Sequence, residues 1–356
     1  MLSRMDSAPW TQRGRFMMCC FPLHGRYFAA SLQCLVATTA LAGAPDITPI
    51  VPAAGPDSAQ MVRALNSVYG ARPHVRANHA KGLLLQAEFT PSPDAASVSR
   101  APHFHGAPSL VLVRFSNFGG RPDITDSDAL AFPYGMALKF KLANGHETDL
   151  VMHSFNGFPS ATAADFVDFM TAMGRSPVGA QHPTMLERYA DSHPQAKAFL
   201  AMAKPAPASF ISQPYFSVNA FQFTNAAGQI SYGRYRMVPD GAAHFIEGTL
   251  LTHAAPDHLS TDIRARLVNG PVRMSLQLQL ADSGDALDDP SIAWPLARRV
   301  ITLGSVRIDK VVDLAALDEQ ALVFLPDELP DGIEVRDPMI KARTRAYVES
   351  FEQRMR

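Results

Sequence analysis

The 356-residue sequence predicts an α+β fold in which an antiparallel β-barrel core, or a strongly bent antiparallel sheet, is surrounded by helices. Strand-like segments follow one another in series, and two of them contain turn sequences typical of β-hairpins. Helical segments do not alternate regularly with these strands, and no glycine-rich phosphate-binding loop follows a strand, so the pattern does not favour a Rossmann-like domain. The sequence shows no internal repeat and no sign of a second domain.

Residues 1–44 have the features of an export signal. Basic residues, among them Arg15 and Arg26, precede the apolar run "YFAASLQCLVATTALAGA", which ends in small residues at Ala44. The run is shorter than the roughly 20 apolar residues that a membrane-spanning helix needs. We therefore expect cleavage near Ala44 and a periplasmic or secreted mature protein with no membrane attachment. An N-terminal membrane anchor is the alternative.

The composition limits the chemistry that the mature chain can use. All three cysteines, Cys19, Cys20 and Cys34, lie in the expected export signal, so no disulfide or zinc–cysteine site is expected after cleavage. The whole chain has 32 Lys and Arg against 33 Asp and Glu, and loss of the leader makes this balance mildly acidic. Neither nucleic acid nor an anionic membrane surface is therefore expected as a partner.

The remaining chain is predicted to divide into a linker and one domain. Residues 45–60 form the predicted linker, which begins with "PDITPIVPAAGPD", and residues 61–356 form the one predicted domain. A short helix is expected to begin where the linker ends, with Ser58 as its N-cap and Gly70 as its stop. The first packed element is thus expected to be a helix.

Strands and helices follow in a definite order along the domain. Strands are expected within 82–90, 109–118, 135–155 and 215–238, and the last two of these contain hairpin turns. A helix is expected at 162–174, where Thr162 and Asp165 occupy capping positions. The further elements are helices within 183–204, 260–268 and 337–356, and strands within 271–281 and 298–308.

Three motifs that lie far apart along the chain bear on function: "RANHAKG" at 76–82, "VLVRFSNFGG" at 111–120 and "KARTRAYVESFEQRMR" at 341–356. Together with "GMALKF" followed by "DLV", and with "FQFTNAAG", they resemble the haem catalases, in the same order and over nearly the whole mature chain. The chain most resembles the short, exported catalase-related peroxidases, which lack the long C-terminal additions of full catalases. The resemblance implies an antiparallel barrel, a haem b cofactor and a reaction with peroxide.

The last motif places Arg343 and Tyr347 four residues apart, on one face of the predicted C-terminal helix. A guanidinium one helical turn away favours the phenolate form of a tyrosine over the phenol. A phenolate is a hard, anionic ligand for ferric iron, and tyrosine is the axial ligand of catalase-type haem. Tyr347 is therefore predicted to be the metal ligand, with Arg343 as its partner. A surface tyrosine–arginine pair is the alternative.

The resemblance places His79 on the other face of the haem, as the catalytic base. A neutral imidazole can take a proton from one oxygen of a peroxide and deliver it to the other, so that water leaves. Ser116 matches the serine of the family that hydrogen-bonds the second ring nitrogen of this histidine and fixes its tautomer. Without the resemblance, a structural histidine and an ordinary strand serine would explain both residues.

Further contacts with the cofactor are implied by residues near these motifs. Three arginines match positions at which the family binds the haem propionates: Arg76, Arg114 and Arg354. Four apolar residues are expected around the haem edge: Val75, Phe115, Phe158 and Phe166. For the phenylalanines, packing inside a helix or strand core is the alternative.

Two segments depart from the family pattern. The family has an asparagine after "DLV" that donates to bound peroxide, whereas this sequence has His153 there and Asn156 three residues further on. Phe132 replaces a carboxylate of the peroxide channel, and Tyr134 replaces an arginine. Dismutation requires a second peroxide to be oxidised at the haem, so these changes predict a peroxidase with poor catalase activity. His153 is kept as a candidate catalytic residue, since an imidazole can also hydrogen-bond peroxide.

The sequence therefore predicts a haem peroxidase that reduces hydrogen peroxide or organic hydroperoxides with electrons from a small-molecule donor. Two alternatives stay open: a haem enzyme that isomerises lipid hydroperoxides, and a non-catalytic haem-binding protein. The acidic balance is compatible with a homo-oligomer smaller than the assemblies of full catalases. His103 and His105 have a spacing that can bind a metal, but a third ligand is missing, and both are expected in a solvated loop.

Overall fold

The computed structural model describes residues 56–356 with the exception of 204, 252 and 313–318. The predicted export signal at 1–44 and the predicted linker up to residue 55 lie outside the described residues. The described strands are β1 Gly82–Pro91, β2 Ser109–Ser116, β3 Gly135–Lys141, β4 Glu147–His153, β5 Tyr215–Phe216, β6 Phe221–Thr224, β7 Ile230–Pro239, β8 Val272–Leu280, β9 Val300–Val311 and β10 Ile333–Val335. The described α-helices are α1 Ser58–Tyr69, α2 Ala95–Val98, α3 Ala163–Gly174, α4 Met185–Ser192, α5 Pro194–Ala201, α6 Gly248–Leu251, α7 His258–Val268 and α8 Met339–Met355.

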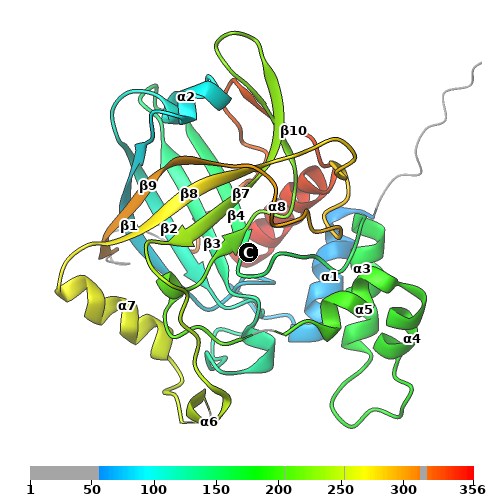
Figure 1. Cartoon of the computed structure of the whole chain (residues 1–356). Coiled ribbons are helices and arrows are strands. Elements are labelled where there is room, and N and C mark those ends of the chain that lie inside the picture. The colour runs from blue at the N-terminus through cyan, green and yellow to red at the C-terminus, as the bar shows by residue number, and fades with distance from the viewer. Residues whose placement is uncertain (1–55, 204, 252, 313–318) are drawn as a thin grey trace, which may run out of the picture. The chain divides into compact units, whose positions relative to one another are not determined.

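Eight antiparallel strands close into a barrel in the order β1, β2, β3, β4, β5, β7, β8 and β9 (Figure 1). The pairing of β7 with β8 and of β9 with β1 completes the ring. β6 and β10 extend the sheet beyond β7. The predicted α+β fold with an antiparallel barrel core is confirmed.

The barrel interior is filled by apolar side chains that alternate along the strands. In β2, Val111, Val113 and Phe115 are completely buried, whereas Leu110 is exposed. Alternate residues of a strand point to opposite faces, so this pattern is expected for a strand with one face toward the barrel interior. Phe115 stacks on Phe210 with ring centroids 5.0 Å apart. The expectation that Phe115 lies at the haem edge is therefore wrong, because the register of β2 points it into the barrel.

His103 is buried rather than solvated. It lies in a 3₁₀ turn, and its ring packs 4.1 Å from that of Phe104 and 4.9 Å from that of Phe140. Burial, followed by repulsion from His105, lowers the pKa of His103 to about 3, so the imidazole packs as a neutral aromatic group. Within the described part of the chain, no group of three or more His, Cys, Asp or Glu side chains could hold a metal ion.

Most predicted helix ends are confirmed. α1 begins at Ser58 and is stopped by Gly70, whose φ of +80° suits glycine. Its N-cap is Asp57 rather than the predicted Ser58, because the Asp57 carboxylate accepts the N–H of Gln60. Thr162 and Asp165 form the expected capping box of α3. The helical region 183–204 divides into α4 and α5, and β10, α2 and α6 were not predicted.

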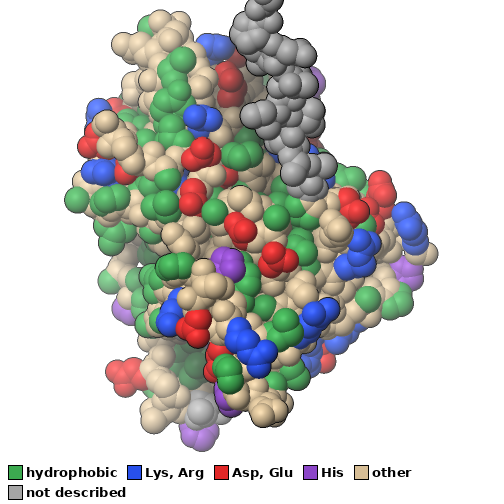
Figure 2. Space-filling model, turned by 90° about the vertical axis from the view of Figure 1, so that its right-hand side faces the viewer, with side chains coloured by type: hydrophobic (Ala, Val, Ile, Leu, Met, Phe, Trp, Pro, Cys, Tyr) green, Lys and Arg blue, Asp and Glu red, His purple; other side chains and the backbone are tan. Residues whose placement is uncertain are grey.

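Helices α1, α3, α4 and α5 gather on one side of the barrel, and α8 lies between this group and the barrel strands (Figure 1). Apolar residues of α1, α3 and α8 form a second core, which includes Met61, Leu65, Phe166 and Met339. On the face shown in Figure 2, basic and acidic side chains are intermixed. No helix in the described ranges combines the length and apolar character needed to cross a membrane.

A buried carboxylate ties the segment that follows His79 to the rest of the domain. Asp126, whose side chain is 1% exposed, accepts hydrogen bonds from Lys81 Nζ at 2.7 Å and from Asn117 Nδ2 at 3.0 Å. Its second oxygen accepts the backbone N–H of Leu259 in α7 at 2.9 Å. Lys81 lies directly before β1, and Asn117 lies directly after β2. The carboxylate of Asp126 therefore joins the start of β1, the end of β2 and the start of α7.

We expect Asp126→Ala to lower the free energy of unfolding by about 3 kcal/mol, because it leaves Asn117 Nδ2 and the Leu259 N–H without their acceptor and removes the buried partner of Lys81, which keeps only the exposed carboxylate of Asp257 as a counter-charge. Urea-induced unfolding followed by far-UV circular dichroism measures this change. Asp123→Ala is the matched control, since Asp123 is an exposed carboxylate whose partner is the neighbouring Arg121, and it should leave stability unchanged. Equal losses in the two variants would contradict the assignment.

Candidate active site

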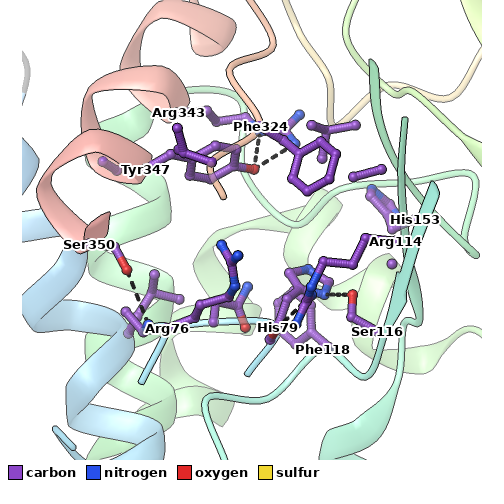
Figure 3. A pocket seen from close by; sticks show the side chains of 18 of the residues that line it. Arg76, His79, Arg114, Ser116, Phe118, His153, Phe324, Arg343, Tyr347 and Ser350 are labelled. Carbon is purple, nitrogen blue, oxygen red and sulfur yellow. Dashed lines mark hydrogen bonds between the residues drawn. The ribbon is translucent and has the colours of Figure 1, made fainter. Parts of the chain in front are cut away.

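A cavity opens between the barrel wall and helices α1, α3 and α8. Strands β2, β3 and β4 and the loop at 76–79 supply the barrel side of its lining. Tyr347 and Arg343 lie on one side of the cavity, and His79 and Ser116 lie on the opposite side (Figure 3). Its lining, which is mostly apolar with a few charged and polar side chains, suits a mostly apolar ligand that carries a few polar groups.

His79 is held as a neutral base at the cavity wall. Its Nδ1 is hydrogen-bonded to Ser116 Oγ at 2.9 Å, as predicted. Its backbone N–H donates to the Phe118 carbonyl at 2.9 Å, and these contacts hold a φ of +55° that a residue other than glycine rarely adopts. Burial, followed by repulsion from Arg114, lowers the pKa of His79 to about 3. The imidazole is therefore free to accept a proton near neutral pH.

Gly135 provides the space for this histidine–serine pair. The pairing of β2 with β3 sets Gly135 directly opposite Ser116. A methyl group in place of a hydrogen of Gly135 would lie 2.6 Å from Ser116 Oγ and 2.7 Å from His79 Nδ1, well inside contact distance. A glycine is therefore required at this position.

His153, the last residue of β4, lines the same cavity. Neither of its ring nitrogens has a hydrogen-bond partner among the described residues. Burial, followed by repulsion from Arg343, lowers the pKa of His153 to about 3, so the ring is neutral and can both donate to and accept from a bound molecule. Asn156, the alternative named from sequence, is not among the residues that line the cavity.

The hydroxyl of Tyr347 is held by the arginine one turn before it. Arg343 Nε and Nη2 both donate to the Tyr347 hydroxyl oxygen, at 3.1 and 2.8 Å. The two N–H groups fix the position of this oxygen at the cavity wall. The predicted pairing on one helix face is confirmed.

Two residues that sequence reasoning did not identify orient this arginine. Asn219 Oδ1 accepts from Arg343 Nη1, and Asn219 Nδ2 donates to Asp337 Oδ2 at 2.8 Å. Asp337 is completely buried, and its other oxygen accepts the N–H of Met339 at the start of α8. Burial raises the pKa of Asp337. The chain of contacts fixes both the arginine and the helix that carries the tyrosine.

The three arginines predicted to bind propionates come together beside the segment 319–322. Arg76 and Arg354 each donate two hydrogen bonds, of 2.7 to 3.0 Å, to backbone carbonyls of this segment. Arg114 Nε contacts the carboxylate of Glu319 at 2.7 Å. Burial, followed by repulsion from Arg114 and Arg354, lowers the pKa of Arg76 to about 8. A depressed arginine pKa marks a site that an added anion would stabilise.

Phe158 and Phe166 line the cavity and stack with their centroids 5.6 Å apart, as expected for apolar walls. Val75 and Phe132 are not among the lining residues. Phe132 is half-buried and packs edge to face on Tyr134 and Phe155, near the end of the long connection from β2 to β3. Its predicted place in a peroxide channel stays a prediction.

Comparisons with known proteins agree with this geometry. The family model Catalase matches residues 59–356. A catalase-related peroxidase of Mycolicibacterium paratuberculosis is 34% identical over 299 residues, which are 83% of this chain and 94% of the relative. One of Synechococcus elongatus is 29% identical over 336 residues, or 93% and 97% of the two chains. The chain belongs to the catalase family.

A solved fungal catalase shares the fold, with a TM-score of 0.71 at 20% identity, over 80% of this chain. This chain spans 60% of the length of that catalase. Catalase A from Saccharomyces cerevisiae gives a TM-score of 0.70 at the same identity, with 79% and 61% of the two chains covered. At this identity the likeness shows the fold alone.

Family membership implies a haem cofactor, and the cavity fits one. Its apolar walls suit a porphyrin, the Tyr347 hydroxyl is held at the cavity wall by Arg343, and an added anion would stabilise the buried charge of Arg76. Tyr347 would therefore hold the iron, and the arginines would hold the carboxylates.

We expect Gly135→Ala to lower peroxide-dependent oxidation of a chromogenic donor by about tenfold or more, because the added methyl group separates His79 from Ser116. The rate is measured at saturating donor with haem-loaded protein. Gly241→Ala is the control, since a methyl group there meets open space, and it should keep the wild-type rate. Full activity in Gly135→Ala would show that the histidine–serine contact is dispensable.

Proposed function

We propose that this protein is a haem b-dependent peroxidase that reduces hydrogen peroxide or organic hydroperoxides with electrons from an external small-molecule donor. The observation that carries the proposal is the placement of the Arg343–Tyr347 and His79–Ser116 pairs on opposite sides of one cavity. The relatives named catalase-related peroxidase, which match most of the chain, support it.

In the proposed reaction, two electrons and two protons from the donor convert the peroxide into an alcohol, or water, and one further water. Haem, when bound, supplies the redox chemistry that breaks the O–O bond. His79 takes the proton from one peroxide oxygen and returns it to the oxygen that leaves. Ser116 keeps the imidazole in one orientation, and Phe118 packs against the ring at 5.3 Å.

We further propose that catalase activity is weak. Dismutation requires that a second peroxide be bound and oxidised inside the cavity. It therefore depends on the cavity lining more strongly than peroxidase turnover, in which an outside donor delivers the electrons. His153 stands where the resemblance implies an asparagine, and its nitrogens lie in the cavity. Of the residues that depart from the family pattern at this point, His153 lines the cavity and Phe132 does not, so the argument depends mainly on His153.

Neither alternative from the sequence is favoured by the relatives. Their names describe peroxidases, which supports catalysis over simple haem binding and over isomerisation of lipid hydroperoxides. We also propose export to the periplasm or outside the cell, on the strength of the leader-like sequence at 1–44, and a homo-oligomeric assembly.

We expect His79→Ala to lower the peroxidase rate by about a hundredfold, the usual contribution of a positioned base. The measurement is the initial rate of donor oxidation at fixed haem content. His182→Ala, which removes an exposed imidazole, is the control and should retain activity. An equal loss of rate in both variants, or no loss in either, would contradict the assignment of His79.

Replacing His153 by asparagine should raise oxygen release relative to donor oxidation by about tenfold, because the smaller amide restores the donor that the resemblance implies; this gain corresponds to ~1.4 kcal/mol in the transition state. An oxygen electrode and a donor assay on the same sample give the ratio. His193→Asn, on the partly buried α4–α5 corner, serves as control. If wild type already releases oxygen as fast as it oxidises donor, the proposal of weak catalase activity is wrong.

A further inference from the structure

Three rows of paired residues run along the outer face of strands β3 and β4. In each row the two residues lie directly opposite each other: Gly135 and His153, Ala137 and Val151, and Lys139 and Asp149. Since alternate residues of a strand point to the same face, all three rows share one face. The residues of the first two rows line the cavity, whereas Lys139 and Asp149 are not among its lining residues. The floor of the cavity therefore ends at the third row.

The third row is buried although both of its side chains are ionisable. The side chain of Lys139 is 5% exposed and that of Asp149 is completely buried, with Nζ and Oδ2 2.8 Å apart. Lys139 Nζ also contacts the part-exposed carboxylate of Glu147 at 2.9 Å. Residues on the outer face of an antiparallel sheet commonly meet water, so the burial of this pair requires a cover.

The cover is the segment at 323–325. The N–H of Leu325 donates to Asp149 Oδ2 at 2.7 Å. The ring centroid of Phe324 lies 5.6 Å from Lys139 Nζ, within the range of a cation–π contact. Phe324 is 6% exposed and lines the cavity on the side that carries Tyr347 (Figure 3). The pair thus holds two successive residues, and the ring of the first forms the wall at this end of the cavity.

A buried ion pair contributes little to stability, because removing both charges from water costs about as much as their attraction returns. Both donors use the same oxygen of Asp149, while its Oδ1 is buried and has no hydrogen-bond partner among the described residues. The pair instead specifies which residues of the segment lie over it, since only an N–H at the place of Leu325 completes the bonding of Oδ2. It therefore fixes the register of the segment on the barrel.

We propose that Lys139 and Asp149 are positioning residues that hold Phe324 as the end wall of the cavity and so keep a bound cofactor from leaving at this end. The inference rests on the proposed function, because the cofactor is the ligand whose retention it explains. Neither residue lines the cavity, so both act through the ring of Phe324.

Hydrogen–deuterium exchange of the full-length apoprotein tests the bond to Leu325. Asp149→Asn replaces a charge-assisted hydrogen bond by a neutral one, so the amide of Leu325 should exchange about tenfold faster. Mass spectrometry of overlapping peptides within 319–328 measures the rate. Glu147→Gln is the matched control, since it removes the other carboxylate that contacts Lys139 and leaves the bond to Leu325 in place. It should change the rate by less than about twofold.

Transfer of haem from the ferric protein to an excess of apomyoglobin tests the wall. Haem should leave Phe324→Ala about tenfold faster than wild type and Asp149→Asn about threefold faster. The double variant should be no faster than Phe324→Ala alone, whereas a general loss of stability would make the two effects add. Glu147→Gln should keep the wild-type rate. Phe324→Ala leaves the ion pair in place, so it tests the wall even if far-UV circular dichroism shows that Asp149→Asn is unfolded.

Each contrary result overturns a stated part of the inference. Equal exchange of Leu325 in Asp149→Asn and Glu147→Gln would show that Asp149 does not hold the segment. Additive effects on haem release, or no effect of Phe324→Ala, would show that Phe324 is not the wall through which it acts. These results leave the proposed function standing. A wild-type protein that binds no haem would overturn the proposed function and the retention of the cofactor, while the exchange of Leu325 would still decide the role of Asp149.

Discussion

Arginine side chains gathered around one cavity set most of its chemistry. Together with burial, the positive charge of Arg114 and Arg343 disfavours the imidazolium form of His79, so the base stays neutral. The same Arg343 directs two N–H groups at the Tyr347 oxygen and so positions it. Burial, followed by repulsion from Arg114 and Arg354, lowers the pKa of Arg76, so an added anion would stabilise it. Burial and the arginine charges together therefore account for the neutral base, the placement of the tyrosine and the anionic part of the cofactor.

Local features of the fold were predictable because they depend on residues near one another in sequence. The capping box at Thr162 and the hairpin between β3 and β4 follow from side-chain and turn chemistry within a few residues. β10 was missed, since its three residues form a strand only by pairing with β6, which lies more than a hundred residues earlier. Nothing in its own sequence specifies that partner.

The site residues differ in the same way: those close in sequence could be paired from the sequence, and those far apart could not. Arg343 and Tyr347 could be paired from helical spacing, whereas His79 and Ser116 were paired only through the family resemblance, because the register of β1 on β2 brings them together. Asp337 could have been identified as a capping residue, because it is an acidic residue before a proline at the start of a predicted helix. The ion pair between Arg114 and Glu319 had no such signal, since its two residues lie 205 positions apart in sequence.

The histidine at position 153 changes the shape of the cavity wall as well as its hydrogen bonding. Burial keeps the ring neutral, so near neutral pH it adds no charge beside His79. The ring lines the cavity beside Phe158, at 6.4 Å between the ring centroids, and it is bulkier than the amide that the resemblance implies. The first peroxide meets His79 in peroxidase and in catalase turnover alike, but only dismutation needs a second peroxide to be held at this wall. This difference is the reason why the proposal of weak catalase activity depends on His153.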